Sequence, residues 1–563
     1  MIITKINRLT VLLLVMICST FSMAAASEAE YKKLAKTWIL NADGSQEFHY
    51  TMELTLYTHA AMNGKYGESF IVYNPLYQTL KINEAYTKQK NGEIIQTPIN
   101  ALVEVLPRNA AHAPAYNHLK EMVVVHTGLE LGATIHLDYT LSSKAGYLPE
   151  LDIFEMIQQS SPVKEYTLTA VTPADKPLNY ALANSKANAM VREEGGKQIV
   201  SWTLRNVPQQ STASFTHISN GDLPYLAATT FANSKMALQT LKDQLVEEND
   251  EIRSVAAKLT KKSNNKTDQL KAIVNYVNKQ CSACSLTLEQ TGYRFRSANK
   301  VINTAYGTEM EKANLLTALL RSSGFEAEIL VGYPISSNKG LALKAIDHLY
   351  VSVDNQQYVL SINTLNRPQP VVFGQSPVYS ILEGKRIHTK PAADYQLKCE
   401  QIWNVTHDKW SVSTKEKIGS DLLPYFTAKE SVNEFTMPIK SQSGYTTLVL
   451  PGSDYGFSNL GYGRLNSERD GNLLLPRLVN EAYTYTINCP ENMKLRTING
   501  HKEIHNLAGD LVFSIQKEGT KISVHRSLIL KKQLYSASEY AALRQLLGSW
   551  SDVNSRTMIF SVN

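Results

Sequence analysis

The residues with the clearest potential for chemistry lie at one predicted helix start. Thr308 is followed three residues later by Glu311, and this pair predicts a capping box at a helix N-terminus. The helix is therefore predicted to begin near Glu309 and to end at Gly324 in the left-handed conformation. A cysteine in such a first turn would lose its proton easily, because it faces the positive end of the helix dipole. This position holds a glutamate instead.

A histidine and a polar residue further along the chain could complete a site with Glu309. His348 opens one predicted strand, and the next predicted strand contains Ser361 and Asn363. Glu309 and His348 form a candidate acid–base pair, because carboxylate and imidazole groups both move protons. Serine or asparagine can hydrogen-bond an imidazole, but neither supplies the charge that stabilises an imidazolium. The simpler interpretation makes Glu309 a helix-dipole partner and His348 a hydrogen-bonded strand histidine at the edge of a pocket.

Residues 307–316 read Gly-Thr-Glu-Met-Glu-Lys-Ala-Asn-Leu-Leu. This segment resembles the pattern Gly-Asp-Cys-Lys-Asp-Lys-Ala-Asn-Leu-Leu of the transglutaminase-like core in exported bacterial proteins, in the same register. The resemblance implies a papain-like α+β core in which Glu309 occupies the nucleophile position and His348 matches the histidine. It places Ser361 or Asn363 at the position of the aspartate. The resemblance therefore implies a degenerate triad, and we expect no catalytic residue.

Four cysteines follow the N-terminal leader, at positions 281, 284, 399 and 489. The close pair Cys281 and Cys284 is interpreted as a local disulfide or as two reduced structural thiols. A redox motif would place the first cysteine at a helix start, whereas this pair follows the predicted helix 270–277. A zinc site would need a second nearby pair. We therefore expect no metal and no cofactor, and a relocated cysteine nucleophile remains an alternative.

The N-terminal part is rich in strands. Runs of alternating apolar residues, such as Phe48 to Leu56 and Ile135 to Leu141, are separated by turn signals and predict an antiparallel β-sandwich. The same part contains the segments KYGES, YNPLYQTLKINEAYT, TGLELGATIHLDYT and SSPVKEYTLTAVTP. In these segments it resembles the bacterial domain of unknown function DUF3857. The resemblance implies a fold but no activity.

The chain of 563 residues is too long for a single core, and its patterns predict a multidomain α+β protein. The C-terminal part returns to strands and ends in a helix that a second capping box, Ser536 with Glu539, would open. The predicted order is a signal peptide at 1–26, a DUF3857-like β-sandwich at 27–230, a helical connector at 231–264, a transglutaminase-like core at 265–375 and a C-terminal β-rich region of one or more domains at 376–563.

The first residues have the pattern of a cleaved export signal. Lys5 and Arg8 precede an apolar run at 9–18, and three alanines at 24–26 supply a small-residue cleavage site. No other apolar run is long enough to cross a membrane, so the mature chain is expected to have no transmembrane segment. We expect a periplasmic or cell-surface location. The formal charge of +6 is scattered, which argues against a nucleic-acid partner.

The sequence favours a catalytically inactive binding or scaffold protein, a pseudoenzyme of the cell envelope. Its partner would be a protein, a peptide or a glycan of the envelope. The alternative is an active cysteine-type acyl-transfer enzyme or peptidase that uses a relocated nucleophile.

Overall fold

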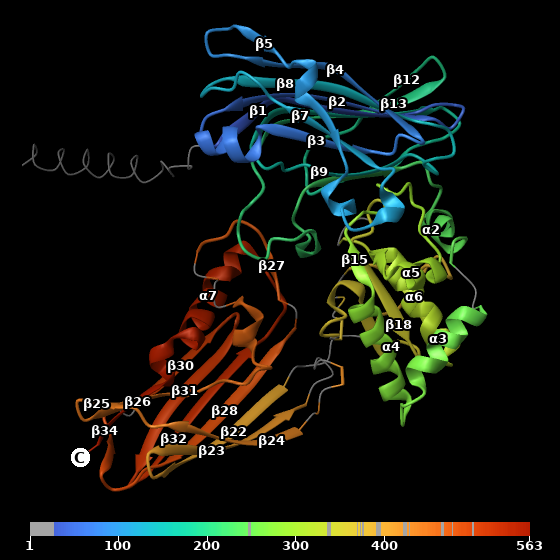
Figure 1. Ribbon diagram of the computed structural model, residues 1–563. Helices are drawn as coiled ribbons and strands as arrows, with labels where there is room; N and C mark the ends of the chain where they lie inside the picture. Colours follow the sequence, from blue (N-terminus) through green and yellow to red (C-terminus); the bar gives the residue numbers. More distant parts are fainter. Residues whose placement is uncertain are drawn as a thin grey trace, which may run out of the picture.

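A computed structural model shows three domains joined in one chain (Figure 1). The predicted signal peptide lies outside the described residues. The structure describes residues 27–562 except 246–248, 335–338, 369, 372, 374–375, 390–395, 420–424, 427, 429, 463–464, 466, 476 and 498–499.

The N-terminal domain is the predicted β-sandwich. Its large sheet has the strand order β12-β13-β10-β1-β2-β8-β4-β5. The pairs are antiparallel except that β1 and β10 run parallel, with Leu34 opposite Tyr166. The strands of this sheet are β1 (Ala29–Leu40), β2 (Gln46–Leu56), β4 (Gln78–Lys88), β5 (Ile94–Gln96), β8 (Thr134–Ser143), β10 (Val163–Pro173), β12 (Met190–Glu194) and β13 (Lys197–Val207).

Two three-stranded sheets complete the N-terminal domain. One has the order β3-β7-β6, and the other has the order β11-β14-β9. Buried residues of the large sheet, Leu34, Tyr166 and Trp202 among them, share one hydrophobic core with Ile153 of β9 and Leu226 of β14. The strands are β3 (Glu68–Tyr73), β6 (Leu102–Val105), β7 (Lys120–Val125), β9 (Asp152–Met156), β11 (Asn179–Ala183) and β14 (Tyr225–Thr229).

The central domain combines helices with a five-stranded sheet of order β19-β18-β17-β20-β21. A short parallel pair, β15 (Ser282–Cys284) with β16 (Tyr306–Thr308), leads into the helix α6. The other elements are α2 (Ser234–Lys242), α3 (Asp250–Thr260), α4 (Lys266–Gln280), α5 (Ala298–Thr304), α6 (Glu309–Ser322), β17 (Ala327–Gly332), β18 (His348–Val353), β19 (Tyr358–Ser361), β20 (Val378–Ser380) and β21 (Lys385–Arg386).

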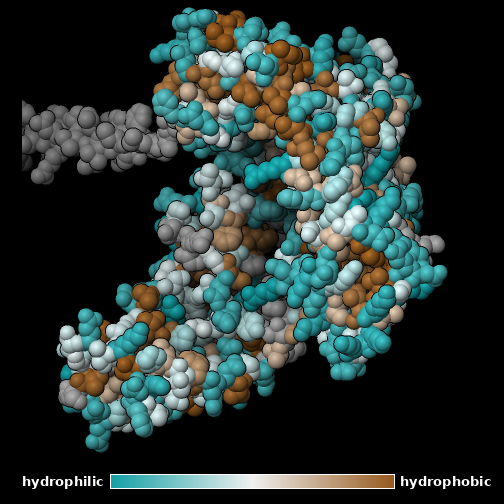
Figure 2. All heavy atoms as spheres, viewed as in Figure 1, coloured by the Kyte–Doolittle hydropathy of each residue, from teal (hydrophilic) through white to brown (hydrophobic). Residues whose placement is uncertain are grey.

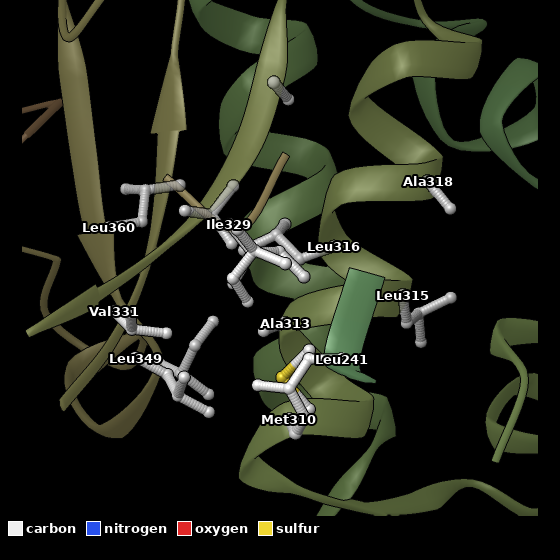
Figure 3. Close-up of a cluster of buried hydrophobic side chains, with 14 of the residues drawn as sticks. Leu241, Met310, Ala313, Leu315, Leu316, Ala318, Ile329, Val331, Leu349 and Leu360 are labelled. Atoms are coloured by element: carbon white, nitrogen blue, oxygen red, sulfur yellow. The ribbon is translucent and has the colours of Figure 1, made fainter. Parts of the chain in front are cut away.

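Helix α6 is the centre of this domain. It begins at Glu309 with the predicted capping box, and every residue from Met310 to Leu320 is buried. Figure 3 shows Ala313 and Leu316 directed toward residues of the sheet, including Ile329 on β17, while Leu315 and Ala318 point to the opposite side. The helix is therefore enclosed on both sides, which fixes the position of its first turn.

The central core is larger than the predicted range 265–375. Leu238 and Leu241 of α2 and Ile252 of α3 belong to the same hydrophobic cluster as α6, so the predicted connector is part of this domain. At the other end, β20 and β21 continue the sheet as far as Arg386.

The C-terminal domain has a seven-stranded sheet, a four-stranded sheet and the helix α7 (Ala537–Ser551) around one hydrophobic core. The predicted capping box of Ser536 and Glu539 opens α7. The sheet orders are β24-β23-β22-β28-β32-β31-β30 and β25-β26-β34-β29. The strands are β22 (Gln396–Thr406), β23 (Lys409–Ile418), β24 (Glu430–Pro438), β25 (Ser441–Gln442), β26 (Tyr445–Val449), β28 (Val479–Asn488), β29 (Met493–Leu495), β30 (His501–Asn506), β31 (Gly509–Glu518), β32 (Lys521–Leu530) and β34 (Thr557–Val562); a further two-stranded sheet pairs β27 (Leu473–Leu474) with β33 (Leu534–Tyr535).

A loop of the N-terminal domain, residues 208–224, reaches the C-terminal domain. Phe215 stacks on Tyr462 with ring centroids 4.3 Å apart, and Asn220 donates a 2.8 Å hydrogen bond to the carbonyl of Asn472. The loop hangs below the sandwich in Figure 1, and Figure 2 shows a hollow in the surface beneath the N-terminal domain. Among the described residues, no helix has the length and apolar character needed to cross a membrane.

Candidate functional site

The first turn of α6 opens into a cavity of about 770 Å³. The cavity lies where α6 meets the start of β18 and the segment after β19, and Phe154 of the N-terminal domain also lines it. The predicted site residues come together here, because the cavity is lined by Glu309, His348 and Asn363 and also by Cys281, Cys284, Lys312 and Asp347.

Glu309 is tied to the third predicted position. The side-chain amide of Asn363 donates a 3.1 Å hydrogen bond to Oε1 of Glu309, whereas Ser361 ends β19. Of the two residues considered for that position, Asn363 is therefore the one that contacts the site. Burial raises the pKa of Glu309, although Asn363, His348 and the amide of Leu349 each act to lower it.

His348 has a carboxylate partner that the sequence reasoning missed. Nδ1 of His348 lies 3.0 Å from Oδ2 of Asp347, and this contact raises the pKa of His348. Asp347 therefore supplies the negative charge that neither Ser361 nor Asn363 can offer to this imidazole. The family pattern places the carboxylate on the strand after His348, whereas here Asp347, the residue just before His348, supplies the negative charge. The only sequence signal is the Asp-His pair itself.

The cysteines form no disulfide in the described part of the chain, where all four are free. Cys281 and Cys284 lie on extended backbone, so their Cα atoms are about 10 Å apart. A disulfide needs less than about 7 Å. The structure thus corresponds to the second interpretation, two reduced structural thiols. Burial raises the pKa of both thiols, which disfavours the reactive thiolate.

Comparisons with known proteins identify the domains. Family models match DUF3857, a domain of unknown function, at residues 42–211, and the transglutaminase-like superfamily at residues 253–360. A crystal structure from Parabacteroides distasonis, described as that of a candidate protease, covers 95% of this chain and 99% of its own. The two chains share 39% identity with a TM-score of 0.80. The chain belongs to the DUF3857/transglutaminase-like protein family. Both resemblances stated from sequence are therefore confirmed.

The C-terminal domain of this DUF3857/transglutaminase-like protein matches a third model, the domain of unknown function DUF3858, at residues 449–560. An M1 zinc metallopeptidase from Deinococcus radiodurans shares 12% identity over 45% of this chain and 65% of its own. Its TM-score of 0.19 supports no statement about this protein. No curated protein matches the chain.

Glu311 anchors the transglutaminase-like core to the DUF3857 domain. Its side chain is fully buried, and it pairs with Arg296 at 2.9 Å. It also accepts a 2.9 Å hydrogen bond from the amide of Thr308 and a hydrogen bond from the hydroxyl of Tyr116, which belongs to the DUF3857 domain. Burial acts to raise the pKa of Glu311, but these partners bring it below its ordinary value. The first turn of α6 is thus fixed from two domains.

A lysine and a second histidine add to the site, and the sequence reasoning missed both. Lys312 lines the cavity, and burial lowers its pKa. His217, from the loop 208–224, places Nε2 3.9 Å from Oδ1 of Asp347. Its ring centroid is 5.7 Å from that of His348. No local pattern could reveal His217, because this contact joins residues 130 positions apart in two domains.

Proposed function

We propose that this DUF3857/transglutaminase-like protein is an exported binding module of the cell envelope that does no thiol chemistry. The observation that carries the proposal is Glu309 at the start of α6, the position where the family has its cysteine. Its carboxylate accepts a hydrogen bond from the side chain of Asn363. The buried thiols of Cys281 and Cys284, with their raised pKa values, support it further. The export step is proposed from the leader pattern alone.

The cavity favours a peptide among the partners that the sequence left open. Its volume of about 770 Å³ lies in the range that encloses a small organic ligand or a short peptide segment. The carboxylate of Glu309 accepts hydrogen bonds, and a peptide amino group is a charged donor that matches it. Binding of an amino group to Glu309 is the recognition step that we propose.

Peptide binding is expected to depend on the charge of Glu309. Glu309→Gln should weaken the affinity for a short peptide with a free amino terminus by about tenfold, because hydrogen bonds to a charged group are worth about 1.5–3 kcal/mol. Fluorescence anisotropy with a labelled peptide library measures the effect. The same peptides with acetylated amino termini serve as the matched control. Equal affinities of the wild type for free and acetylated peptides would contradict this recognition step.

The proposal that the protein does no thiol chemistry is tested by placing the family's cysteine at position 309. At pH 6, iodoacetamide should label the new thiol of Glu309→Cys about 100-fold faster than Cys281 or Cys284, because the helix N-terminus and the neighbouring imidazole favour a thiolate. Labelled positions are identified by mass spectrometry, with Glu309→Ala as the control. Rapid labelling of Cys281 or Cys284 in the wild type that is abolished by His348→Ala would contradict the proposal.

A second candidate function is peptide hydrolysis by Glu309 and His348 as an acid–base pair. The pairing of His348 with Asp347 favours it, because a carboxylate orients an imidazole and stabilises its charged form. The related Parabacteroides structure is described as that of a candidate protease. Cleavage of a peptide library that survives thiol blocking and is lost in both Glu309→Gln and His348→Gln would establish this function in place of the first.

A further inference from the structure

Three side chains with metal-binding groups converge at the edge of the cavity. One ligand atom from each of His217, Asp347 and His348 lies within 4.8 Å of the other two. We propose that these three residues bind one divalent transition-metal ion, with Zn²⁺ as the best match. The site is independent of the proposed peptide binding, because it does not use Glu309 as a ligand.

The type and spacing of the ligands fit zinc. Two imidazole nitrogens and one carboxylate oxygen form a common three-ligand set for Zn²⁺. Bonds of about 2.0–2.2 Å in a tetrahedral site place the ligand atoms about 3.4 Å from one another. Nδ1 of His348 lies 3.0 Å from Oδ2 of Asp347, and Nε2 of His217 lies 3.9 Å from Oδ1, the other oxygen of the same carboxylate. Rotation of the carboxylate and of the two imidazole rings would bring one oxygen and both nitrogens to the spacing of a tetrahedral site.

The backbone holds each ligand in place. The amide of Asp347 donates a 2.9 Å hydrogen bond to the carbonyl of Gly332. His348 is the first residue of β18, and its ring lies parallel to that of Tyr350 at 5.8 Å. The loop that carries His217 is fixed just beyond it by Asn220, which donates to the carbonyls of Phe215 and Asn472. The three ligands thus lie on segments whose backbone is held by hydrogen bonds.

The exposure of the three side chains leaves room for an ion to enter. The side chain of His217 is 51% exposed, that of His348 35% and that of Asp347 19%. Three protein ligands leave a fourth coordination position for water or for a bound molecule, as in catalytic zinc sites. Asp347 and His348 also line the cavity, so the ion would lie at its edge.

Binding of the ion would join the domains. His217 lies on the loop 208–224, just beyond the DUF3857 match at 42–211, whereas Asp347 and His348 lie within the transglutaminase-like match at 253–360. The loop of His217 also contacts the C-terminal domain through Phe215 and Asn220. A metal ion at this point would therefore attach the loop 208–224 to the transglutaminase-like core as well as to the C-terminal domain. Because the ion would bind only the folded chain, it would raise the thermal stability by mass action.

The test is a metal titration of the full chain after treatment with a chelator. Zn²⁺ added against a chromophoric competitor should bind at one equivalent per chain. His217→Ala, Asp347→Asn and His348→Ala should each weaken the affinity at least about tenfold. Co²⁺ in place of Zn²⁺ should give the visible absorption of a tetrahedral site with nitrogen and oxygen ligands, and this band should vanish in all three variants.

A matched control comes from the C-terminal domain. His505 lies 2.9 Å from Asp510 and 3.3 Å from Glu503 on an exposed surface, so His505→Ala tests nonspecific binding to histidine and carboxylate groups. This variant should bind Zn²⁺ as the wild type does. His217 is about half exposed, so its replacement should leave the fold intact, which circular dichroism verifies. Failure to bind one equivalent, or unchanged affinity in His217→Ala, would overturn the proposal.

Discussion

Replacement of Glu311 by alanine is expected to lower the free energy of unfolding of the transglutaminase-like core by about 3–5 kcal/mol. The variant would leave the guanidinium of Arg296 without its buried carboxylate partner. It would also leave the hydroxyl of Tyr116 and the amide of Thr308 without their acceptor. Chemical denaturation followed by circular dichroism at 222 nm measures the loss, because most of the α-helices in the described part of the chain lie in this domain.

The same turn of α6 provides the control for Glu311→Ala. Glu309→Gln changes a partly exposed carboxylate in that turn and should alter the free energy of unfolding by less than about 1 kcal/mol. Tyr116→Phe removes one hydrogen bond to the buried carboxylate and should cost about 1.5–3 kcal/mol. If Glu311→Ala proved no more costly than Glu309→Gln, the ion pair would not be what holds the first turn in place.

The fold was predictable wherever its signals are local. A capping box needs only a threonine or serine and a glutamate three residues apart, so Glu309 and Ala537 were found as helix starts from neighbouring residues. Alternating apolar residues likewise predicted the sandwich. The predicted boundary at 264 did not follow the core, because the sharing of one hydrophobic cluster by α2, α3 and α6 is a long-range property. The predicted boundary at 375 fell short because β20 and β21 pair with the central sheet across a loop.

In the candidate site, too, residues with a signal in the sequence were predicted and residues brought in by long-range contacts were not. Glu309, His348 and Asn363 were found because a family pattern orders them along the chain, and the structure brings them to one cavity. Asp347 was missed because the pattern directs attention to the next strand, and His217 was missed because it reaches the site from another domain. The disulfide alternative for the cysteine pair failed on a backbone conformation that residue types alone do not determine.

A second buried acid links the DUF3857 domain to the core. Oδ2 of Asp152, on β9, accepts a 2.8 Å hydrogen bond from the amide of Lys344, while its Oδ1 is buried with no hydrogen-bond partner. Burial raises the pKa of Asp152 to about 7 from its ordinary 3.8, although the amide and the ammonium of Lys344 act against the shift. The folded protein therefore holds this proton more tightly than the unfolded chain does.

This difference predicts a stability that falls as the pH rises. Below pH 3.8 the carboxyl is protonated in both the folded and the unfolded chain, so it does not change the free energy of unfolding. Between pH 3.8 and about 7 the carboxyl ionises only in the unfolded chain, so the free energy of unfolding decreases as the pH rises. Above pH 7 the full cost of about 4 kcal/mol is present.

Asp152→Asn removes this titration but keeps an oxygen that can accept from the amide of Lys344. The variant should match the wild type in acid and should exceed it at pH 8 by up to about 4 kcal/mol in the free energy of unfolding. Chemical denaturation at pH 4.5, 6 and 8, followed by circular dichroism, measures the difference. Asp175→Asn, which removes an exposed carboxylate from the same domain, is the matched control variant. A constant offset between wild type and Asp152→Asn at all three pH values would mean that Asp152 is already ionised in the folded protein, and that the interface accommodates its charge.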